Sequence, residues 1–274
     1  MPTTIITGST SGIGLEVAKE LARKDHKLIL VSRDIVKLKH TSSILNKEKK
    51  INCEIYQHDL SLIKENISFY EKISKKHRNI DYLINNVGAI FMERQVTAEG
   101  LEKTFSLNHM SYFVLSKMFS QQEKPLKIIN VSSEAHRNIS LNFDDLQNEK
   151  NYNGWYSYKK SKLANIYLTY EMHKHLQKKG STVNCLHPGV VNTNFANNNT
   201  LPFKIMASII KYFGITPREG ASTILYLVSN DDIQNASGLY FKKCIPEESS
   251  SVSHNEKYSQ QLWDYSEKIL SNYI

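Results

Sequence analysis

The sequence predicts an α/β fold in which one doubly wound, parallel sheet of about seven strands carries helices on both faces. Two observations predict it. Short runs rich in β-branched residues alternate with longer amphipathic runs from the amino terminus onward, which is the pattern of strands joined by crossover helices. The 274 residues also contain no internal repeat and no interdomain linker. We therefore expect residues 1–274 to form a single domain.

Each predicted strand is a short run bounded by polar or turn-forming residues. The runs cover residues 3–7, 27–32, 52–57, 81–85, 126–132, 181–187 and 238–241. The clearest amphipathic runs lie at 13–23, 101–119 and 155–178, and we expect each to be a helix. Two segments interrupt the alternation, at 192–218 and 246–257, and such excursions from a sheet commonly carry specificity.

Composition narrows the class of protein. With 40% hydrophobic and 23% charged residues, the chain has enough apolar material for a globular core. The formal charge of +8 suits solubility better than nucleic-acid binding, because glutamates are interspersed among the lysines and no basic stripe carries interleaved aromatic residues. No apolar run reaches the roughly 18 residues that a membrane span needs. Cys53, Cys185 and Cys244 lie far apart in apolar strand-like runs, so we expect reduced core thiols in a cytoplasmic protein.

Three glycines follow the first predicted strand. Gly8, Gly12 and Gly14 stand between that strand and an amphipathic helix, in the spacing Gly-x-x-x-Gly-x-Gly. Closely spaced glycines let a backbone turn tightly and approach a pyrophosphate, whose charge is stabilised by exposed N–H groups at the positive end of the following helix. An ordinary strand-to-helix turn is the alternative. The position after the first strand favours a Rossmann-type dinucleotide site.

The end of the second predicted strand bears on the choice of cofactor. A ribose 2′-hydroxyl is usually bound by an acidic residue at this position, whereas a 2′-phosphate needs a cation. The chain offers Ser32 and Arg33, with Lys37 one helical turn further on, and a guanidinium suits phosphate. Asp34 would repel a phosphate, but it also fits as a helix N-cap. We therefore expect NADP rather than NAD, and the alternative for Arg33 is a solvated surface arginine.

Two overlapping tyrosine–lysine pairs share the predicted helix at 155–178. At about 100° per residue, Tyr158 and Lys162 lie on a face that becomes apolar, whereas Tyr156 and Lys160 lie on a charged face. The charged face continues through Tyr167, Glu171, Lys174 and Lys178. Tyr158 and Lys162 should therefore point inward, where a lysine is costly unless it has a task. A nearby ammonium lowers the pKa of a tyrosine from about 10, and such a tyrosine can exchange a proton with a substrate oxygen.

Five short motifs, taken in order, resemble those of the short-chain dehydrogenases/reductases. They are TGSTSGIG (7–14), NNVG (85–88), VSS (131–133), YKKSK (158–162) and HPGVVNT (187–193). Five further stretches are similar to the retinol dehydrogenase-like branch, and the likeness runs nearly end to end. These are VSRD (31–34), NHMSYF (108–113), NVSSEAHR (130–137), YSYKKSKLAN (156–165) and QLWDYSEKIL (261–270). The resemblance implies an oxidoreductase that moves a hydride between a nicotinamide and a carbonyl or alcohol carbon.

The resemblance implies catalytic roles for four residues. Tyr158 would be the general acid/base, and Lys162 would lower its pKa and hold the nicotinamide ribose. Ser133 would hydrogen-bond the substrate oxygen and the developing alkoxide, although it could merely end a strand. Asn108 would anchor a water that links Lys162 to solvent as a proton relay.

It also implies a cofactor site assembled from several loops. The pyrophosphate would be wrapped by Gly8, Ser9, Gly12, Ile13 and Gly14. The other contacts would come from Ser32 and Arg33 at the 2′-phosphate, Asp59 at the adenine, Asn86 and Gly88 on the adenosine side, Tyr158 and Lys162 at the ribose, and Val191 and Thr193 near the carboxamide. Two of these have structural alternatives, since Asp59 could cap a turn and Asn86 could bridge strands. Val87 also departs from the commoner alanine and adds two methyl groups beside the cofactor.

The segment at 192–218 is where this family builds its substrate lid. Here it is rich in apolar residues, which predicts a small apolar carbonyl or alcohol as substrate: a retinoid, steroid, fatty aldehyde or xenobiotic carbonyl. Ordinary helix packing is one alternative, and a lysine-flanked stretch resting on a membrane surface is another. Relatives commonly pair through the two long helices that flank the active site, which raises the expectation of a homo-oligomer.

A second function class competes with the NADP(H)-dependent oxidoreductase. A binding protein that senses NADP(H) without turnover would keep the fold and the glycine loop. It would need no acid/base group, however, so the presence of Ser133, Tyr158 and Lys162 favours an enzyme.

Overall fold

One mostly parallel sheet forms the centre of the molecule. The computed structural model describes residues 1–48, 53–176, 180–191 and 214–274. Within them, eight strands form a single sheet in the order β3-β2-β1-β4-β5-β6-β7-β8, parallel except for β8 at one edge. The strands are β1 (Thr3–Thr7), β2 (Lys27–Ser32), β3 (Glu54–Gln57), β4 (Tyr82–Asn85), β5 (Lys127–Val131), β6 (Thr182–His187), β7 (Leu239–Lys242) and β8 (Ile245–Glu247). The predicted α/β fold class is confirmed.

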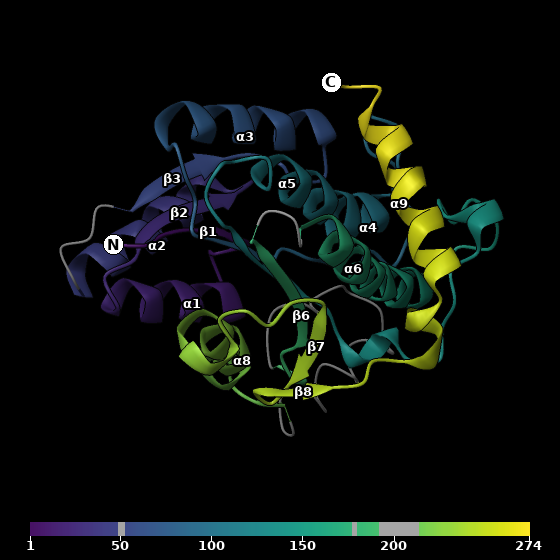
Figure 1. Cartoon of the computed structure of the whole chain (residues 1–274). Helices are drawn as coiled ribbons and strands as arrows, with labels where there is room; N and C mark the ends of the chain where they lie inside the picture. The colour runs from purple at the N-terminus through teal and green to yellow at the C-terminus, as the bar shows by residue number, and fades with distance from the viewer. Residues whose placement is uncertain (49–52, 177–179, 192–213) are drawn as a thin grey trace.

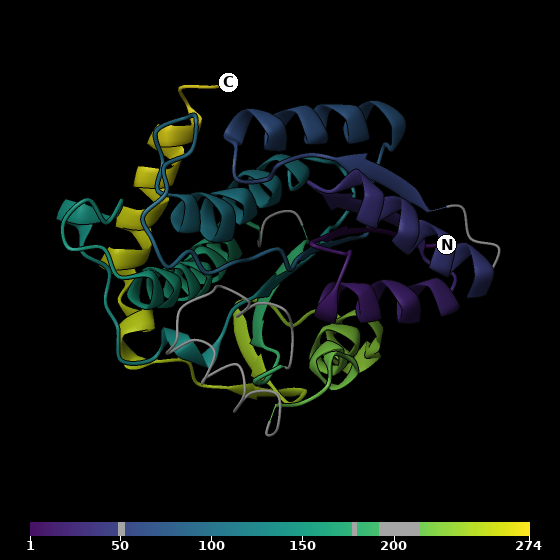
Figure 2. The same cartoon turned by 180° about the vertical axis from the view of Figure 1, so that it is seen from behind.

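Helices cover both faces of this sheet, as Figures 1 and 2 show. The α-helices are α1 (Gly12–Arg23), α2 (Ile35–Glu48), α3 (Ile63–Lys76), α4 (Lys103–Phe105), α5 (Ser111–Phe119), α6 (Gly154–Leu176), α8 (Pro217–Ser229) and α9 (Glu256–Leu270). The shorter turns are the π-helical η1 (Ser106–Met110) and the 3₁₀ turns η2 (Glu134–His136), η3 (Phe143–Asp145), η6 (Asp231–Ile233) and η7 (Ser251–His254). Helices α1, α2 and α8 lie on one face of the sheet, and α3, α5 and α6 on the other, with α9 outside α6.

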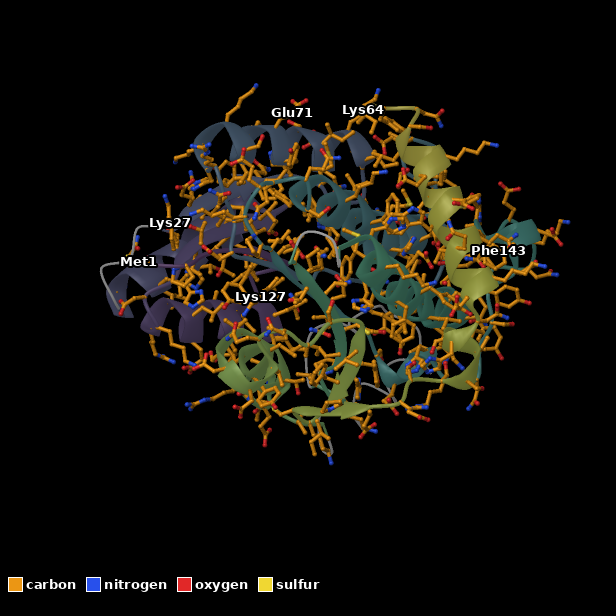
Figure 3. The ribbon with its side chains drawn as sticks, in the orientation of Figure 1. Met1, Lys27, Lys64, Glu71, Lys127 and Phe143 are labelled. Carbon is orange, nitrogen blue, oxygen red and sulfur yellow. The ribbon has the colours of Figure 1, made fainter. Side chains whose placement is uncertain are left out.

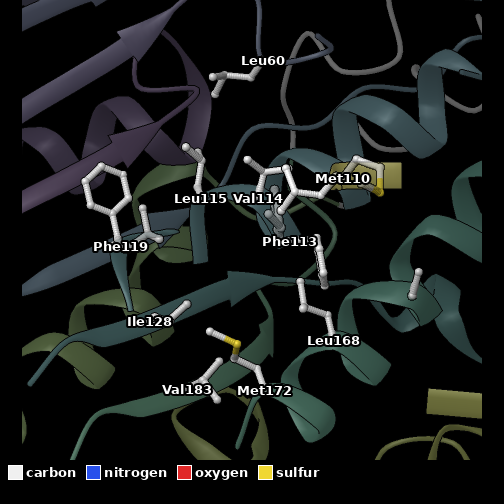
Figure 4. Packing of buried hydrophobic residues seen from close by; sticks show 14 of the residues in the cluster. Leu60, Met110, Phe113, Val114, Leu115, Phe119, Ile128, Leu168, Met172 and Val183 are labelled. Atoms are coloured by element: carbon white, nitrogen blue, oxygen red, sulfur yellow. The ribbon is translucent and has the colours of Figure 1, made fainter. Parts of the chain in front are cut away.

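The core is divided by the sheet into two layers. Successive side chains of a strand point to opposite faces, so the fully buried Ile5 packs toward α3, α5 and α6 whereas Ile6 packs toward α1 and α8. Figure 4 shows part of the first layer, which includes Leu115 of α5, Leu168 of α6 and Val183 of β6. Burying each side chain of this kind contributes about 1.5–3 kcal/mol. Because both faces are covered, the strands are continuous apolar runs in the sequence.

The eighth strand is a difference from the sequence prediction. The segment that was expected to be a polar loop from residue 246 begins instead with β8, which pairs antiparallel with β7. Lys243 and Cys244 form the turn between them, both with left-handed φ, of +50° and +64°. Pro246 is tolerated because β8 is an edge strand. Cys53 and Cys185 are buried free thiols as predicted, but Cys244 lies partly exposed in this turn and not in a core strand.

The face of α6 that carries Tyr156 and Lys160, which was predicted to be exposed along its length, is partly buried. Tyr156 is 53% exposed, as expected, but Tyr167 and Glu171 are buried because the carboxy-terminal segment covers them. The Tyr167 hydroxyl donates to the Val252 carbonyl at 2.7 Å, and the Ser259 hydroxyl of α9 donates to Glu171 at 2.8 Å. The outer face of α6 is thus covered by the chain's own helix, and the homo-oligomer expected from the resemblance stays a prediction.

Charged side chains lie on the outside of these layers. Lys64 and Glu71, for example, are exposed on α3 (Figure 3). Among the described residues, no helix combines the length and apolarity that crossing a membrane requires. Most of the predicted lid, at 192–213, lies outside the described residues, so the lid and its contact with a membrane surface stay predictions.

Candidate active site

The strand order reverses between β1 and β4, and the loops that follow these two strands meet there. In open parallel sheets, ligands bind in the crevice outside the carboxyl ends of the strands at such a reversal. Asn86 Nδ2 donates to the carbonyl oxygens of Thr7 at 2.9 Å and Gly8 at 3.1 Å. The Thr7 hydroxyl oxygen accepts from the N–H groups of Asn86 and Val87. The bridging alternative for Asn86 is therefore present in the structure, and its contact with adenosine stays a prediction.

The loop between β1 and α1 requires its glycines for two different reasons. Gly8 and Gly12 have φ values of +65° and +54°, in the left-handed region that favours glycine. At Gly14 the reason is space, since a Cβ there would lie 2.3 Å from the Gly8 carbonyl oxygen and 2.6 Å from Asn86 Nδ2. The loop backbone is therefore close-packed at Gly14 against Gly8 and the Asn86 side chain, which leaves no room for a larger residue.

The amino terminus of α1 is open toward the same loop. Its N-cap residue, Ser11, makes no side-chain capping hydrogen bond, and the first turn contains no acidic residue. The buried Ser9 hydroxyl has no hydrogen-bond partner among the described residues. Unsatisfied N–H groups at the positive end of a helix, with a hydroxyl beside them, suit a phosphate group. The loop therefore fits the pyrophosphate of a dinucleotide.

Ile13 and Val191 meet against α8 at the other side of this loop. A Cβ on Gly220 would lie 2.6 Å from Val191 Cγ2 and 3.2 Å from Ile13 Cγ1, so both side chains pack on that glycine. Val191 also pairs with Ile215 in an isolated parallel bridge. Two residues predicted to contact the cofactor are thus brought together from distant loops. The third residue of this group, Thr193, lies outside the described residues.

Arg33 is exposed at the end of β2. Asp34 next to it accepts from the Lys37 N–H at 3.0 Å, and Lys37 Nζ lies 3.6 Å from its carboxylate. The backbone bond from Lys37 holds the pKa of Asp34 below its usual range. Asp34 also donates its own N–H to Ser32 Oγ at 3.5 Å. Asp34 therefore has the predicted capping role, and no described carboxylate pairs with the Arg33 guanidinium, which leaves it available to a phosphate.

Asp59 stabilises the turn that follows β3. Its Oδ1 accepts from the Ser61 N–H at 3.0 Å and from the Ser61 hydroxyl at 2.8 Å. The turn-capping alternative for Asp59 is therefore present in the structure, and its contact with adenine stays a prediction.

Ser133, Tyr158 and Lys162 come together from the β5–η2 turn and α6. The Ser133 hydroxyl hydrogen-bonds the Tyr158 phenol and accepts from the Ala135 N–H at 3.1 Å. Lys162 Nζ lies 5.6 Å from the centre of the Tyr158 ring and donates to the Val131 carbonyl at 2.9 Å. Tyr158 is 8% exposed and Lys162 is 3% exposed. The helical face that the sequence predicted to point inward does so.

Burial shifts the ionisation of this pair in opposite directions. It raises the pKa of Tyr158 to about 12, and the hydrogen bond from Ser133 offsets part of that rise. It lowers the pKa of Lys162 to about 7. The sequence predicted that the neighbouring ammonium would lower the pKa of Tyr158, and this prediction is wrong for the protein alone. The reason is that dry surroundings disfavour both the phenolate and the ammonium, so Tyr158 keeps its proton at neutral pH.

Asn108 lies in the π-helical turn η1, which divides the predicted helix at 101–119 into α4 and α5. Its side chain holds Ala89, because Oδ1 accepts from the Ala89 N–H and Nδ2 donates to the Ala89 carbonyl, each at 2.9 Å. Nδ2 also donates to Ser161 at 3.0 Å. π-Helical turns inside helices frequently mark functional sites, and this one brings Asn108 to the loop after β4.

Gly88 leaves a space between Asn108 and Lys162. A Cβ on Gly88 would lie 3.4 Å from Asn108 Oδ1 and 3.5 Å from Lys162 Nζ, so both polar atoms face that space. Their hydrogen bonds go elsewhere, to Ala89 and Val131. The water relay predicted for Asn108 would run through this space and stays a prediction.

Four apolar residues around Tyr158 were not predicted from the sequence. Ile90 packs with Tyr158, and Met92 and Ala135 pack against them. Trp155 stacks on Tyr158 with ring centres 5.6 Å apart, and it remains 36% exposed. The contact between Trp155 and Tyr158 could have been predicted, because two aromatic side chains three residues apart on one helix lie on the same face. An apolar wall beside the tyrosine suits an apolar substrate.

The family to which this chain belongs is decided by comparison with known proteins. The family model for short chain dehydrogenases matches residues 2–202. That range includes the glycine loop, the π-helical turn with Asn108, and the Ser133, Tyr158 and Lys162 set. The chain belongs to the short-chain dehydrogenase family. The five motifs that carried the resemblance all lie within the matched range, and this short-chain dehydrogenase is a member of an oxidoreductase family.

Curated relatives place this short-chain dehydrogenase in the retinol dehydrogenase-like branch. Human retinol dehydrogenase 14 is 32% identical over 288 residues, which cover 98% of this chain and 86% of the relative. Human retinol dehydrogenase 12 is 33% identical over 270 residues, which cover 97% and 85%.

Solved structures agree on the fold of this short-chain dehydrogenase. An uncharacterized protein from Mycobacterium paratuberculosis superposes with a TM-score of 0.78 at 25% identity, covering 99% of this chain and 94% of the other. A short chain dehydrogenase from Shigella flexneri 2a, complexed with NADP, has a TM-score of 0.66 at 20% identity, covering 89% and 97%. The family fold is one that binds a nicotinamide cofactor, and the loop geometry described above fits such a group.

Proposed function

We propose that the protein is an NADP(H)-dependent reductase of small apolar carbonyl compounds. The observation that carries the proposal is the meeting of Ser133, Tyr158 and Lys162 in a buried corner beside the glycine loop. A phenol with a hydroxyl bonded to it and a lysine amine nearby are the groups needed to protonate a carbonyl oxygen and stabilise the charge that develops on it.

Each residue has a separate part in that chemistry. The bound nicotinamide supplies the hydride that reduces the carbonyl carbon. Tyr158 donates its proton to the carbonyl oxygen, and the Ser133 hydroxyl hydrogen-bonds the same oxygen as charge develops there. The Lys162 ammonium then stabilises the phenolate that remains on Tyr158. Since the pKa of Tyr158 is raised to about 12, the residue carries at neutral pH the proton that a reduction consumes.

The choice of cofactor and substrate rests on the charges at the end of β2 and on the apolar residues around Tyr158. Arg33 and Lys37 provide cations at the end of β2, and the only acidic residue between them, Asp34, is engaged in capping α2. This favours NADP(H) over NAD(H). Ile90, Met92 and Trp155 surround Tyr158 with apolar surface, and the curated relatives are retinol dehydrogenases. We therefore place retinoids beside steroids, fatty aldehydes and xenobiotic carbonyls as candidate substrates.

The proposal includes a cytoplasmic location. Its support is that Cys53 and Cys185 are buried free thiols, which suits a reducing compartment. Expression of the tagged chain and imaging of the living cells would check it, and accumulation in an oxidising compartment would overturn it.

The proposed activity is tested by NADPH consumption with a panel of apolar aldehydes and ketones that includes retinal. Tyr158→Phe keeps the ring and removes the hydroxyl, so we expect kcat/KM to fall by about 10²–10⁴ while the Kd for NADPH stays within about twofold. Tyr156→Phe is the matched control, because Tyr156 lies on the same helix but is 53% exposed, and it should retain wild-type turnover.

The opposite result would identify a different function. A wild-type protein that binds NADPH tightly but consumes none with any member of the panel would be a cofactor-sensing binding protein. Equal loss of turnover in the two variants would show that Tyr158 has no special role.

A further inference from the structure

His136 connects the β5–η2 turn to a segment more than a hundred residues away. It is the last residue of η2, and its side chain is fully buried. Ring atom Nδ1 lies 2.6 Å from the Ser133 carbonyl oxygen, and Nε2 lies 3.0 Å from the backbone nitrogen of Ser250. Both ring nitrogens are therefore in use, although the residue is outside the proposed catalytic set.

The two partners define the protonation of the ring. The Ser250 N–H can only donate, so Nε2 must be the acceptor, and the Ser133 carbonyl can only accept, so Nδ1 carries the hydrogen. His136 is therefore a neutral imidazole in a single tautomer. It bridges an acceptor on one segment to a donor on the other.

The bond to Ser133 bears directly on the serine side chain. The Ser133 carbonyl accepts both from His136 Nδ1 and from the His136 backbone N–H at 3.1 Å. These bonds fix the direction of the peptide plane that follows the serine. The Ser133 hydroxyl is then aligned to accept from the Ala135 N–H and to donate to the Tyr158 phenol.

The surroundings hold His136 itself in place. Its ring packs at a steep angle against Tyr240 of β7, with ring centres 5.2 Å apart. The Tyr240 hydroxyl donates to Glu134 at 2.6 Å, and Glu134 also accepts from Arg137 at 3.1 Å and Lys242 at 3.3 Å. The η2 turn is thus also held by residues of β7.

We propose that His136 is a positioning residue for the reaction: by bridging the Ser133 carbonyl and the Ser250 N–H, it holds the Ser133 hydroxyl against Tyr158. This inference rests on the proposed reductase activity. It makes the segment before η7 part of the catalytic geometry, although that segment touches neither Tyr158 nor Lys162 in any described contact. A displacement of a catalytic group by about 1 Å can lower a rate about 100-fold, so a support of this kind affects turnover directly.

Two substitutions distinguish the hydrogen-bonding role of His136 from a role in packing alone. His136→Leu removes both ring nitrogens, whereas His136→Asn keeps an amide donor near the position of Nδ1. His26→Leu is the matched control, because His26 is also a buried histidine (6% exposed) that hydrogen-bonds one neighbour, Thr4 at 2.8 Å, but it lies at the amino ends of the strands. Thermal unfolding of all three variants reports how much each loses in stability alone.

The first readout needs neither cofactor nor substrate. The Ala135 N–H donates to the Ser133 hydroxyl oxygen, so its hydrogen-exchange rate reports the placement of that side chain. We expect exchange at Ala135 to become about tenfold faster in His136→Leu, which corresponds to the loss of one ordinary hydrogen bond. Exchange in His26→Leu should match the wild type, and His136→Asn should recover most of the protection.

The second readout is turnover. His136→Leu should lower kcat/KM about 100-fold with the Kd for NADPH unchanged, and His136→Asn should lie within about tenfold of the wild type. If His136 acts through the serine, the double variant Ser133→Ala/His136→Leu will be no slower than Ser133→Ala alone.

Either readout can overturn the inference. Unchanged exchange at Ala135 in His136→Leu, or losses of kcat/KM that multiply in the double variant, would show that His136 does not position Ser133. If the wild type turns over no carbonyl compound, the reductase assignment fails, and the exchange rate then decides the placement of Ser133 by itself.

Discussion

Lys162 Nζ lies 5.6 Å from the centre of the Tyr158 ring, and both side chains are almost completely buried. Lys162 donates to the Val131 carbonyl, and Tyr158 is hydrogen-bonded by Ser133. Burial raises the pKa of Tyr158 to about 12 and lowers that of Lys162 to about 7. The buried Lys162 amine therefore costs the protein stability at neutral pH, whereas Tyr158 is protonated in both the folded and the unfolded state.

Replacing Lys162 by methionine should stabilise the protein and abolish turnover. With a folded pKa of about 7 against about 10.4 when unfolded, Lys162 binds fewer protons in the folded state. The free energy of unfolding should therefore rise from about pH 7 to about pH 10, and it should level off below pH 7, where the amine is protonated in both states. Removing the amine spares roughly 4 kcal/mol at pH 7 but leaves the Val131 carbonyl unpaired, for a net gain of about 2 kcal/mol.

Urea unfolding of this variant at pH 7 and pH 10, without cofactor, measures the gain and the slope. Lys159→Met is the control, because the Lys159 amine bonds the Asn138 carbonyl at the surface, and it should change stability by less than about 0.5 kcal/mol. A Lys162→Met protein that is less stable than wild type, or keeps its pH slope, would contradict this account of the buried amine.

Gly14→Ala should destabilise the protein and weaken NADPH binding. The new Cβ would lie 2.3 Å from the Gly8 carbonyl oxygen, and a backbone atom cannot move aside without opening the loop. We expect a loss of about 1–3 kcal/mol in the free energy of unfolding. Calorimetric titration of NADPH would show the weaker binding, and wild-type affinity would mean that the loop tolerates a side chain here.

Gly88→Ala should lower turnover but leave stability and NADPH binding nearly unchanged, in contrast to Gly14→Ala. Its Cβ would meet Asn108 Oδ1 and Lys162 Nζ only at ordinary contact distances of 3.4 and 3.5 Å, so the protein should fold with nearly wild-type stability. The methyl group would, however, fill the space between these two polar atoms. We expect kcat to fall about tenfold, with the Kd for NADPH largely retained, because a proton relay through that space would be blocked. Unchanged kcat would argue against the relay.

Arg33→Ala should weaken NADPH binding selectively. The exposed guanidinium pairs with no described carboxylate, so its charge is free to bind a 2′-phosphate. We expect the Kd for NADPH to rise about tenfold and that for NADH to stay the same, since a charge-assisted bond to an ionised group contributes about 1.5–3 kcal/mol. Fluorescence titration with both cofactors measures the difference. Lys37→Ala, which removes a partner of Asp34, is the comparison, and equal losses for NADPH and NADH would refute the phosphate contact.

Acid should destabilise the protein through two buried histidines. Burial lowers the pKa of His109 to about 3 and that of His187 to about 4, so both are neutral in the folded protein until strongly acidic pH. Their unfolded pKa is near 6.5, and the unfolded chain therefore binds more protons below that pH. Stability should fall as the pH drops below about 6.5, by roughly 2 kcal/mol per histidine at pH 5.

Thermal unfolding between pH 7 and pH 5 would test this. His109→Phe should reduce the loss of stability at pH 5 by roughly 2 kcal/mol, whereas His40→Asn, a change at an exposed histidine of α2, should leave it intact. A pH dependence that is the same in His109→Phe and the wild type would exclude His109 as its source.

Much of the fold could be predicted because both faces of the sheet are covered. Seven strands could be identified as short apolar runs between amphipathic ones. The eighth, β8, was missed because its residues are exposed and include Pro246. The helical face with Tyr158 was assigned correctly, since an inward lysine is unusual. Tyr167 and Glu171 were assigned to solvent because nothing near them in the sequence shows that α9 would cover them.

By itself, then, the sequence determined the fold class, the glycine loop and the inward face of Tyr158 and Lys162, because strand period, helical face and motif spacing are local properties of a chain. Only the tertiary structure decided that Trp155 stacks on Tyr158, that His136 reaches Ser250 across 114 positions, and that Tyr158 keeps its proton. These properties depend on which surfaces meet and how completely they exclude water, and no local pattern of residues specifies that.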